Sequence, residues 1–182
     1  MKRTSLLIVV AIAITYCPAQ IPGSLDFSFG DWGKSFTDFN SRRNVGDVIE
    51  IAPDGGLIVC GTNGYANESN DCLLLKLTPE GEPDLTFGNQ GRISFGFGGE
   101  TSFCCDMEVL ADGRILVAGS CQDGGNQNIG LAKFTAAGQP DPTFGYGGTL
   151  MVNLGKNEYA SSILKLSNNK FVITGPISDP GE

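Results

Sequence analysis

The chain has 182 residues, with 12 Lys and Arg against 20 Asp and Glu, no His, and a net charge of −8. This acidity disfavours binding to nucleic acid or to anionic lipid, and the lack of His excludes Ser-His-Asp triads, Cys-His nucleophiles and the usual Cys/His zinc sites. The 41% of hydrophobic residues are enough for a core, and the 26 glycines indicate many tight turns.

The N-terminus predicts a secretory signal peptide over residues 1–19. Lys2 and Arg3 precede an apolar run from Leu6 to Ile14, which is shorter than the roughly 20 residues of a membrane-spanning helix. We expect cleavage after Ala19, which leaves 10 cations against 20 acids, and a mature chain that is secreted or held at the cell surface without insertion into the membrane. Lipid attachment at Cys17 is an alternative that the bulky Tyr16 argues against.

A phrase of the form Asp-x-[Ser/Thr]-Phe-Gly-x-x-Gly occurs three times, with its Phe at 29, 87 and 144 and spacings of 58 and 57 residues. The Asp can form an Asx turn, the glycines permit positive φ, and the Phe can wedge between successive units. Trp32, within the first copy, is expected to cover the outer edge of the first blade. We assign a structural role, with no catalytic, cofactor or metal role, to Asp26, Phe29, Gly30, Asp84, Phe87, Gly88, Asp141, Phe144 and Gly145.

Between the copies, apolar runs alternate with turn residues. Asp54-Gly55, Asp112-Gly113 and Asn168-Asn169 are typical of type I′ hairpins, in which both central residues have positive φ. Eleven short strands are predicted, at residues 35–39, 48–52, 57–60, 73–77, 92–95, 107–110, 115–118, 130–134, 150–154, 163–166 and 171–174.

Four strands in about 57 residues are the content of one propeller blade. We therefore predict an all-β, β-propeller-like array of about three four-stranded antiparallel blades that form an incomplete, open arc. The units are 20–82, 83–139 and 140–182, the third lacks its outer strand, and further blades of a longer chain are expected beyond Glu182.

The three phrases, each followed by a hairpin that ends in Gly, resemble the delta-60 repeat family, and the resemblance extends over essentially the whole mature chain. It implies a propeller-like array in secreted or surface-attached bacterial proteins, and it brings no catalytic residues. Asn168-Asn169 departs from the Asp-Gly of the pattern.

The loops opposite the repeated phrase differ from unit to unit, which makes that face the expected binding surface. These loops are residues 40–46, 62–71, 96–104, 120–128 and 155–160. Residues 67–71 and 123–126 offer oxygen ligands for Ca²⁺, although they lack the spacing of a dedicated loop, and solvated polar loops are the simpler interpretation. Asn67-Glu68-Ser69 fits a glycosylation sequon. Aromatic residues that could stack on sugars, or pack as ordinary loop residues, are Tyr65, Phe97, Phe103 and Tyr159.

Five cysteines remain after cleavage, and this odd number leaves one unpaired: Cys60, Cys72, Cys104, Cys105 and Cys121. If Asp112-Gly113 is a two-residue turn, Cys104 faces Cys121 across one strand pair, and this pair is a candidate disulfide. Cys60 with Cys72 is a second candidate pair. The alternative is that all five are small buried hydrophobic residues.

Three functions remain open. The chain can be a non-enzymatic binding or structural scaffold whose partner is an extracellular protein or a carbohydrate. It can be a propeller glycoside hydrolase or lyase that uses Glu50, Asp106 and Glu108. It can also be a Ca²⁺-dependent carbohydrate-binding module. We expect the scaffold, because every repeated residue has an explanation in folding.

Overall fold

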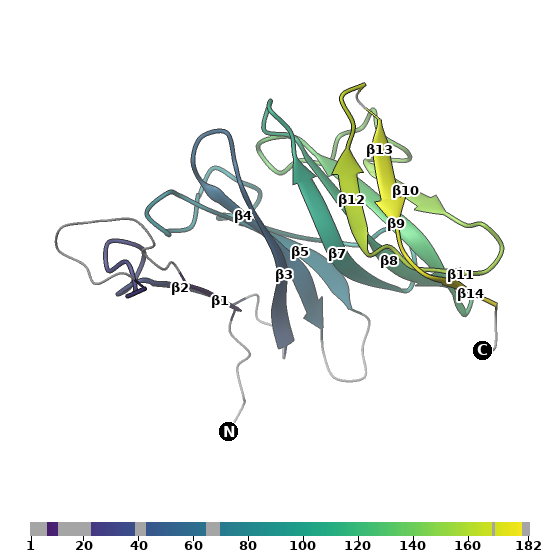
Figure 1. Cartoon of the computed structure of the whole chain (residues 1–182), viewed down its shortest axis with the longest axis horizontal. Helices are drawn as coiled ribbons and strands as arrows, with labels where there is room; N and C mark the ends of the chain where they lie inside the picture. Colours follow the sequence, from purple (N-terminus) through teal and green to yellow (C-terminus); the bar gives the residue numbers. More distant parts are fainter. Residues whose placement is uncertain (1–6, 11–22, 39–42, 65–69, 169, 180–182) are drawn as a thin grey trace.

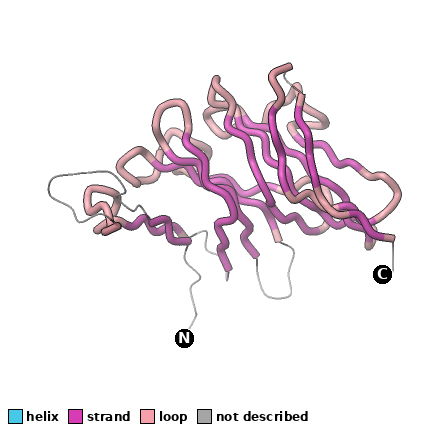
Figure 2. The backbone as a smooth tube through the Cα atoms, viewed as in Figure 1, coloured by secondary structure: helices cyan, strands magenta, loops and turns pink. Residues whose placement is uncertain are grey.

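The computed structural model describes residues 7–10, 23–38, 43–64, 70–168 and 170–179. Within these residues all regular structure is β, in fourteen strands (Figure 2). The described part of the chain accordingly holds no helix long and apolar enough to cross a membrane.

Two four-stranded antiparallel sheets, which we call sheet 1 and sheet 2, form the body of the molecule and lie side by side (Figure 1). Both are meanders in which each strand pairs with the next one along the chain. Sheet 1 contains β3 (Arg43–Ile51), β4 (Leu57–Gly64), β5 (Asp71–Leu77) and β6 (Arg92–Phe95). Sheet 2 contains β7 (Thr101–Val109), β8 (Ile115–Asp123), β9 (Asn126–Phe134) and β10 (Thr149–Val152).

A third hairpin follows sheet 2. β12 (Ser162–Lys165) pairs with β13 (Phe171–Thr174), and β11 (Asn157–Glu158) continues this hairpin by pairing with β14 (Ile177–Ser178). β10 lies in the predicted unit 140–182 but pairs with β9, so it belongs to sheet 2. The fold class is the predicted one, an all-β, incomplete propeller-like array, and the described residues form no closed barrel.

At the other end of the array, β1 (Leu7–Val10) pairs with β2 (Lys34–Thr37). β1 lies inside the apolar run of the predicted signal peptide, and the remainder of residues 1–19 lies outside the described residues. β2 follows the first copy of the repeated phrase, as β6 and β10 follow the second and third copies. The phrase connects the third and fourth strands of one sheet. A sequence unit that begins at the phrase therefore contains the last strand of one sheet and the first three strands of the next.

The hairpins at Asp54-Gly55 and Asp112-Gly113 differ from the predicted type I′ turns. Gly113 N–H donates to Leu110 O at 2.8 Å, Leu110 N–H donates to Arg114 O, and of the two turn residues only Gly113 has positive φ. The loop therefore has three residues, and the facing residues shift by one. A type I′-like turn occurs instead at Gly124-Gly125, where Asp123 faces Asn126 and both glycines have positive φ.

A β-bulge interrupts the first strand of each sheet. The pairing of β3 with β4 shifts between Gly46 and Val48, and that of β7 with β8 shifts between Cys104 and Asp106. The bulge reverses the alternation of side chains, so that Cys104 and Met107 both point into the same core.

A glycine on the second strand accommodates each bulge. A Cβ on Gly119 would overlap the carbonyl oxygen of Phe103 and the ring of Phe97. A Cβ on Gly61 would likewise overlap the carbonyl oxygen of Val45, and one on Gly175 would overlap that of Tyr159. Gly61 and Gly119 lie within β4 and β8, and Gly175 directly follows β13. The close approach of the neighbouring backbone therefore requires Gly at this position.

The core is divided among the spaces between sheets. The largest cluster lies between sheets 1 and 2 and includes Ile58, Leu74, Met107, Val117 and Phe134. A second cluster covers the opposite face of sheet 1, and a third lies between sheet 2 and the third hairpin. Because the inner strands have neighbours on both faces, they are buried along most of their length, as β5 and β8 are.

Candidate functional site

The aspartate of the repeated phrase fixes a turn in each copy. Asp84 Oδ1 accepts hydrogen bonds from the Thr86 N–H at 3.0 Å and from Thr86 Oγ1 at 2.6 Å. Asp26 with Ser28, and Asp141 with Thr143, repeat this pair of bonds at the same distances. The side chain thereby holds the backbone that carries the following Phe.

The Phe and Gly of the phrase contact the turn that follows the third strand of the next sheet. A Cβ on Gly81 would lie 2.8 Å from the Phe29 ring, and a Cβ on Gly138 would lie 2.9 Å from the Phe87 ring. Gly88 N–H donates to Ala137 O at 2.9 Å, and Gly30 N–H donates to Glu80 O. Phe29 and Phe87 are buried. The first and second phrases thus each fasten one sheet to the next.

Phe144 of the third copy is half-buried and packs against the core cluster between sheet 2 and the third hairpin. Its Gly145 has positive φ, and a Cβ there would overlap the carbonyl oxygen of Thr149.

A lysine on the third strand of each sheet neutralises the phrase aspartate. Lys76 Nζ lies 2.5 Å from Asp54 Oδ2 and 3.0 Å from Asp84 Oδ2. Hydrogen bonding to Thr86 and the contact with Lys76 both lower the pKa of Asp84. A single ammonium group therefore joins the hairpin tip to the phrase.

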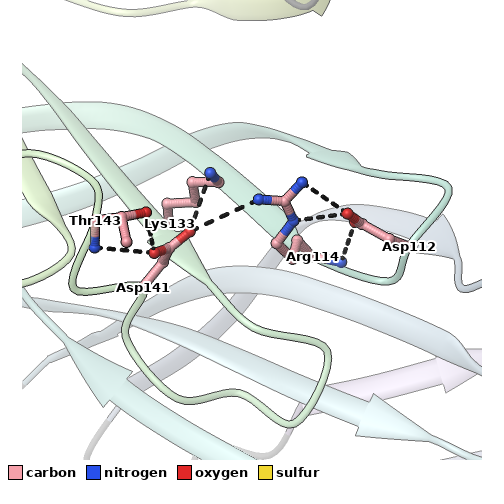
Figure 3. Close-up of polar contacts among 5 residues, drawn as sticks. All are labelled: Asp112, Arg114, Lys133, Asp141 and Thr143. Atoms are coloured by element: carbon pink, nitrogen blue, oxygen red, sulfur yellow. Dashed lines mark hydrogen bonds and ion pairs between the residues drawn. The ribbon is translucent and has the colours of Figure 1, made fainter.

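Sheet 2 repeats this cluster with one more cation (Figure 3). Lys133 Nζ lies 3.0 Å from Asp141 Oδ2, and Arg114 lies 2.7 Å from Asp112 Oδ2 and 4.0 Å from Asp141 Oδ2. The hydrogen bonds from Thr143, followed by that from Lys133, lower the pKa of Asp141 to about 2. Asp141 is therefore ionised at neutral pH and already paired.

A cavity of about 270 Å³ opens between the hairpin tips of sheets 1 and 2. Its charged lining residues, Asp54, Lys76 and Asp112, are held in the ion pairs described above. The rest of the lining is Ala52, Pro53, Ile58, Ala111, Gly113 and Ala136. The cavity is therefore a mostly apolar hollow with its charges compensated by the protein itself.

The acidic residues of the proposed enzyme do not form a free pair. Asp106 Oδ2 accepts hydrogen bonds from Ile163 N–H at 2.8 Å and Ser162 Oγ at 2.7 Å, and Glu108 Oε1 accepts one from Lys165 N–H at 2.9 Å. Both carboxylates thus bind the first strand of the third hairpin. Glu50 is exposed on β3.

The face opposite the repeated phrase is less open than the sequence indicates, because the strands extend into the expected loops. Asp123 to Asn126 is a tight hairpin in place of a cation-binding loop. Phe97, which could stack on a sugar or pack as an ordinary loop residue, is 2% exposed and packs against Gly119 and Gly130. Phe103 and Tyr159 are 40% and 38% exposed. Tyr65 and the sequon Asn67-Glu68-Ser69 lie outside the described residues.

Exposed aromatic side chains also occur on the phrase face, for which no site was predicted. Trp32 is 72% exposed and makes an edge-on contact with Phe27 at 5.9 Å between ring centroids, so it does not cover the edge of a blade. Tyr146, in the third phrase, is 92% exposed. The positive φ of Trp32, 55°, presents its side chain to solvent at the position held by Gln90 in the second phrase.

The register that underlies the Cys104–Cys121 disulfide is wrong. Cys104 faces Gly119, and Cys121 faces Ser102, because the three-residue hairpin and the bulge each shift the pairing by one residue. All five described cysteines are free thiols in the structure. No group of three or more His, Cys, Asp or Glu residues placed to hold a metal ion occurs in the part of the chain that the structure describes.

Repeated meanders, joined face to face by a recurrent phrase, define a β-propeller-like repeat protein. Residues 52–87 and 110–144 match the sequence profile of a family described as "Domain of unknown function (DUF5122) beta-propeller". Each matched segment begins at the end of a first strand and finishes at the Phe of the repeated phrase. No curated protein matches the chain.

Proposed function

We propose that this β-propeller-like chain is a repeat module of the delta-60 type that is secreted or displayed at the cell surface, where it acts as a non-enzymatic binding or structural scaffold. The predicted signal peptide at residues 1–19 supports export. The two segments similar to a propeller family of unknown function support the class of repeat and leave the ligand to be found by experiment.

The main support for a scaffold function is that the charged side chains of the repeats bind other parts of the same chain. Asp54 and Asp84 share Lys76, Asp141 binds Lys133, and Asp106 and Glu108 accept backbone N–H groups of the third hairpin. An acid–base pair needs carboxylates that face substrate, whereas these carboxylates hold the chain together. The repeated chemistry therefore serves assembly of the array.

A partner is best accommodated by surfaces that differ from unit to unit. The half-exposed Phe103 and Tyr159 lie at corresponding positions of β7 and the third unit, on the edge opposite the repeated phrase. Aromatic rings of this exposure can pack on a carbohydrate or on an extracellular protein. We propose this edge as the binding surface.

The test combines a glycan array with an assay of polysaccharide hydrolysis. A carbohydrate-binding scaffold retains glycans without releasing reducing sugar, and the double variant Phe103→Ser/Tyr159→Ser loses retention. The matched control Trp32→Ser, an exposed aromatic on the other face, keeps it. If no glycan is retained, the partner of the scaffold is a protein. Sugar release that disappears in Glu50→Gln, at an unchanged melting temperature, would contradict a non-enzymatic role.

Export is tested separately by expression of residues 1–182 in a bacterial host. We expect protein outside the cytoplasm with Gln20 as its first residue. A cytoplasmic protein that still begins at residue 1 would contradict export but leave the binding result untouched.

A further inference from the structure

Three thiols meet in the core between sheets 1 and 2. Cys60 and Cys72 are fully buried, and Cys104 is 6% exposed. Cys60, Cys72 and Cys104 belong to one core cluster, and the thiol of Cys104 lies near enough to those of Cys60 and Cys72 to influence their pKa. Cys60 and Cys72 belong to sheet 1, whereas Cys104 belongs to sheet 2. The cluster therefore spans the junction between two blades.

The backbone holds Cys104 against sheet 1. Its N–H donates to Thr62 Oγ1 at 3.3 Å. Thr62 follows Cys60 by two residues on β4, on the same face of the strand, and is the direct cross-strand partner of Cys72 on β5. The position of Cys104 beside both thiols is thus fixed by a contact that does not involve sulfur.

The junction between sheet 2 and the third hairpin repeats this arrangement without thiols. Ala160 N–H donates to Ser120 Oγ at 3.1 Å, as Cys104 N–H does to Thr62. Ala118 and Ala160, which occupy the positions of Cys60 and Cys104, are both buried in the third core cluster. The fold therefore needs small residues at these two positions, and alanine satisfies it. At the first junction the same two positions carry buried thiols within the core cluster between sheets 1 and 2.

We propose that Cys104 forms a disulfide with Cys60, and that this bond joins sheet 1 covalently to sheet 2. The oxidant is a disulfide, either a small molecule or a thiol–disulfide oxidoreductase. The Cys60 thiolate attacks one sulfur of the oxidant and displaces its other sulfur as a thiolate. The Cys104 thiolate then attacks the mixed disulfide and displaces the second thiolate. Two protein thiols lose two electrons and two protons, and the oxidant becomes two thiols.

Burial sets the time at which this bond forms. Removal from water raises the pKa of the thiols of Cys60 and Cys104, and only the thiolate attacks a disulfide. In the folded protein these thiols are both protonated and inaccessible. The bond therefore forms while the chain folds, before the two sheets close over the thiols.

The test is refolding of the purified, reduced chain in a mixture of glutathione and glutathione disulfide, which makes it independent of the proposed export. Remaining thiols are alkylated, and the protein is cleaved on the N-terminal side of aspartate without reduction. This cleavage puts Cys60 in 54–70, Cys72 in 71–83, Cys104 with Cys105 in 84–105, and Cys121 in 112–122. We expect the peptide 54–70 linked to the peptide 84–105.

Three variants complete the assignment. Cys105→Ala should retain the link, whereas Cys104→Ala should lose it. Cys60→Ala/Cys104→Ala reproduces the alanine pair of the second junction, so it should fold and yield no link. The inference is overturned if the peptide 84–105 is fully alkylated after oxidative refolding, if Cys104 links to Cys72 or Cys121 in the unmodified sequence, or if Cys60 links to Cys72.

Discussion

The phrase aspartate performs two tasks with one carboxylate. One oxygen of Asp141 accepts the hydrogen bonds of Thr143, and the other pairs with Lys133. Both interactions favour the ionised form, which is why the pKa of Asp141 falls to about 2. The same arrangement at Asp84 gives a shift in the same direction.

The depressed pKa predicts how stability depends on pH. The unfolded carboxyl titrates near 3.8, so the contribution of Asp141 is fully present above about pH 4 and is lost as the pH falls towards about 2. Melting temperatures measured from pH 7 to pH 2 should fall less steeply for Asp141→Asn than for the unmodified chain. Asp123→Asn, at the exposed end of β8, is the control and should keep the steep decline. Identical slopes in all three proteins would refute this role of Asp141.

The close approach of the Phe103 carbonyl oxygen to Gly119 at the bulge leads to a second prediction for a single residue. Gly119→Ala should lower the free energy of unfolding by about 3 kcal/mol or more, because the new methyl group meets a backbone carbonyl and an aromatic ring that cannot both move. Gly96→Ala is the matched control, since its nearest contact is Ser102 Oγ at 3.3 Å. Urea denaturation measures both changes, and equal losses would show that the bulge does not require glycine.

Among the elements, the sequence was sufficient to predict eleven strands and the meander, because apolar runs and Gly turns repeat with a constant spacing. It did not predict the register. A type I′ turn and a three-residue loop have the same Asp-Gly signature, and nothing in the sequence marks Cys105 as a bulged residue. An error of one residue was enough to place Cys104 opposite the wrong partner.

The candidate site was harder to predict for a related reason. Phe97 was predicted to lie in a variable loop, either stacking on a sugar or packing as an ordinary loop residue, yet it fills space above two strand glycines, Gly119 and Gly130. This contact depends on residues more than 20 positions apart. The sequence around Phe97 therefore does not indicate that Gly119 and Gly130 lie beneath its ring.

Removal of the aromatic side chain of the phrase should destabilise the junction between neighbouring sheets. Phe87→Ala should lower the free energy of unfolding by about 3 to 5 kcal/mol, because a buried ring is removed from its contact with Gly138 and a cavity remains. Leu85→Ala, two residues earlier and 72% exposed, should change it by less than about 0.5 kcal/mol. The two variants are compared by urea denaturation. A loss at Phe87 no larger than that at Leu85 would contradict the wedge.

For the whole molecule, the third hairpin leaves apolar side chains in contact with water. Leu164 and Val172 are direct cross-strand partners and are 60% and 43% exposed. Within the described residues β13 pairs only with β12, and its other edge offers unpaired backbone groups. These features favour association of one molecule with another.

We therefore expect a polypeptide of residues 20–182 to self-associate as its concentration rises, as measured by sedimentation or light scattering. Leu164→Ser/Val172→Thr should shift the sample towards monomer. Leu150→Ser, at a 41% exposed leucine on β10, should shift it less. A polypeptide that remains monomeric at every concentration would disprove association through this hairpin.

The bulge has a geometric meaning for the array. A bulge bends its strand and increases the local twist. Sheets 1 and 2 carry it at the same step of the first strand, so the first strands of neighbouring blades bend at the same point. Deletion of Asp47 or Cys105 would remove the bend from one blade alone. It would also turn the side chains on one side of the deleted residue to the opposite face of their strand.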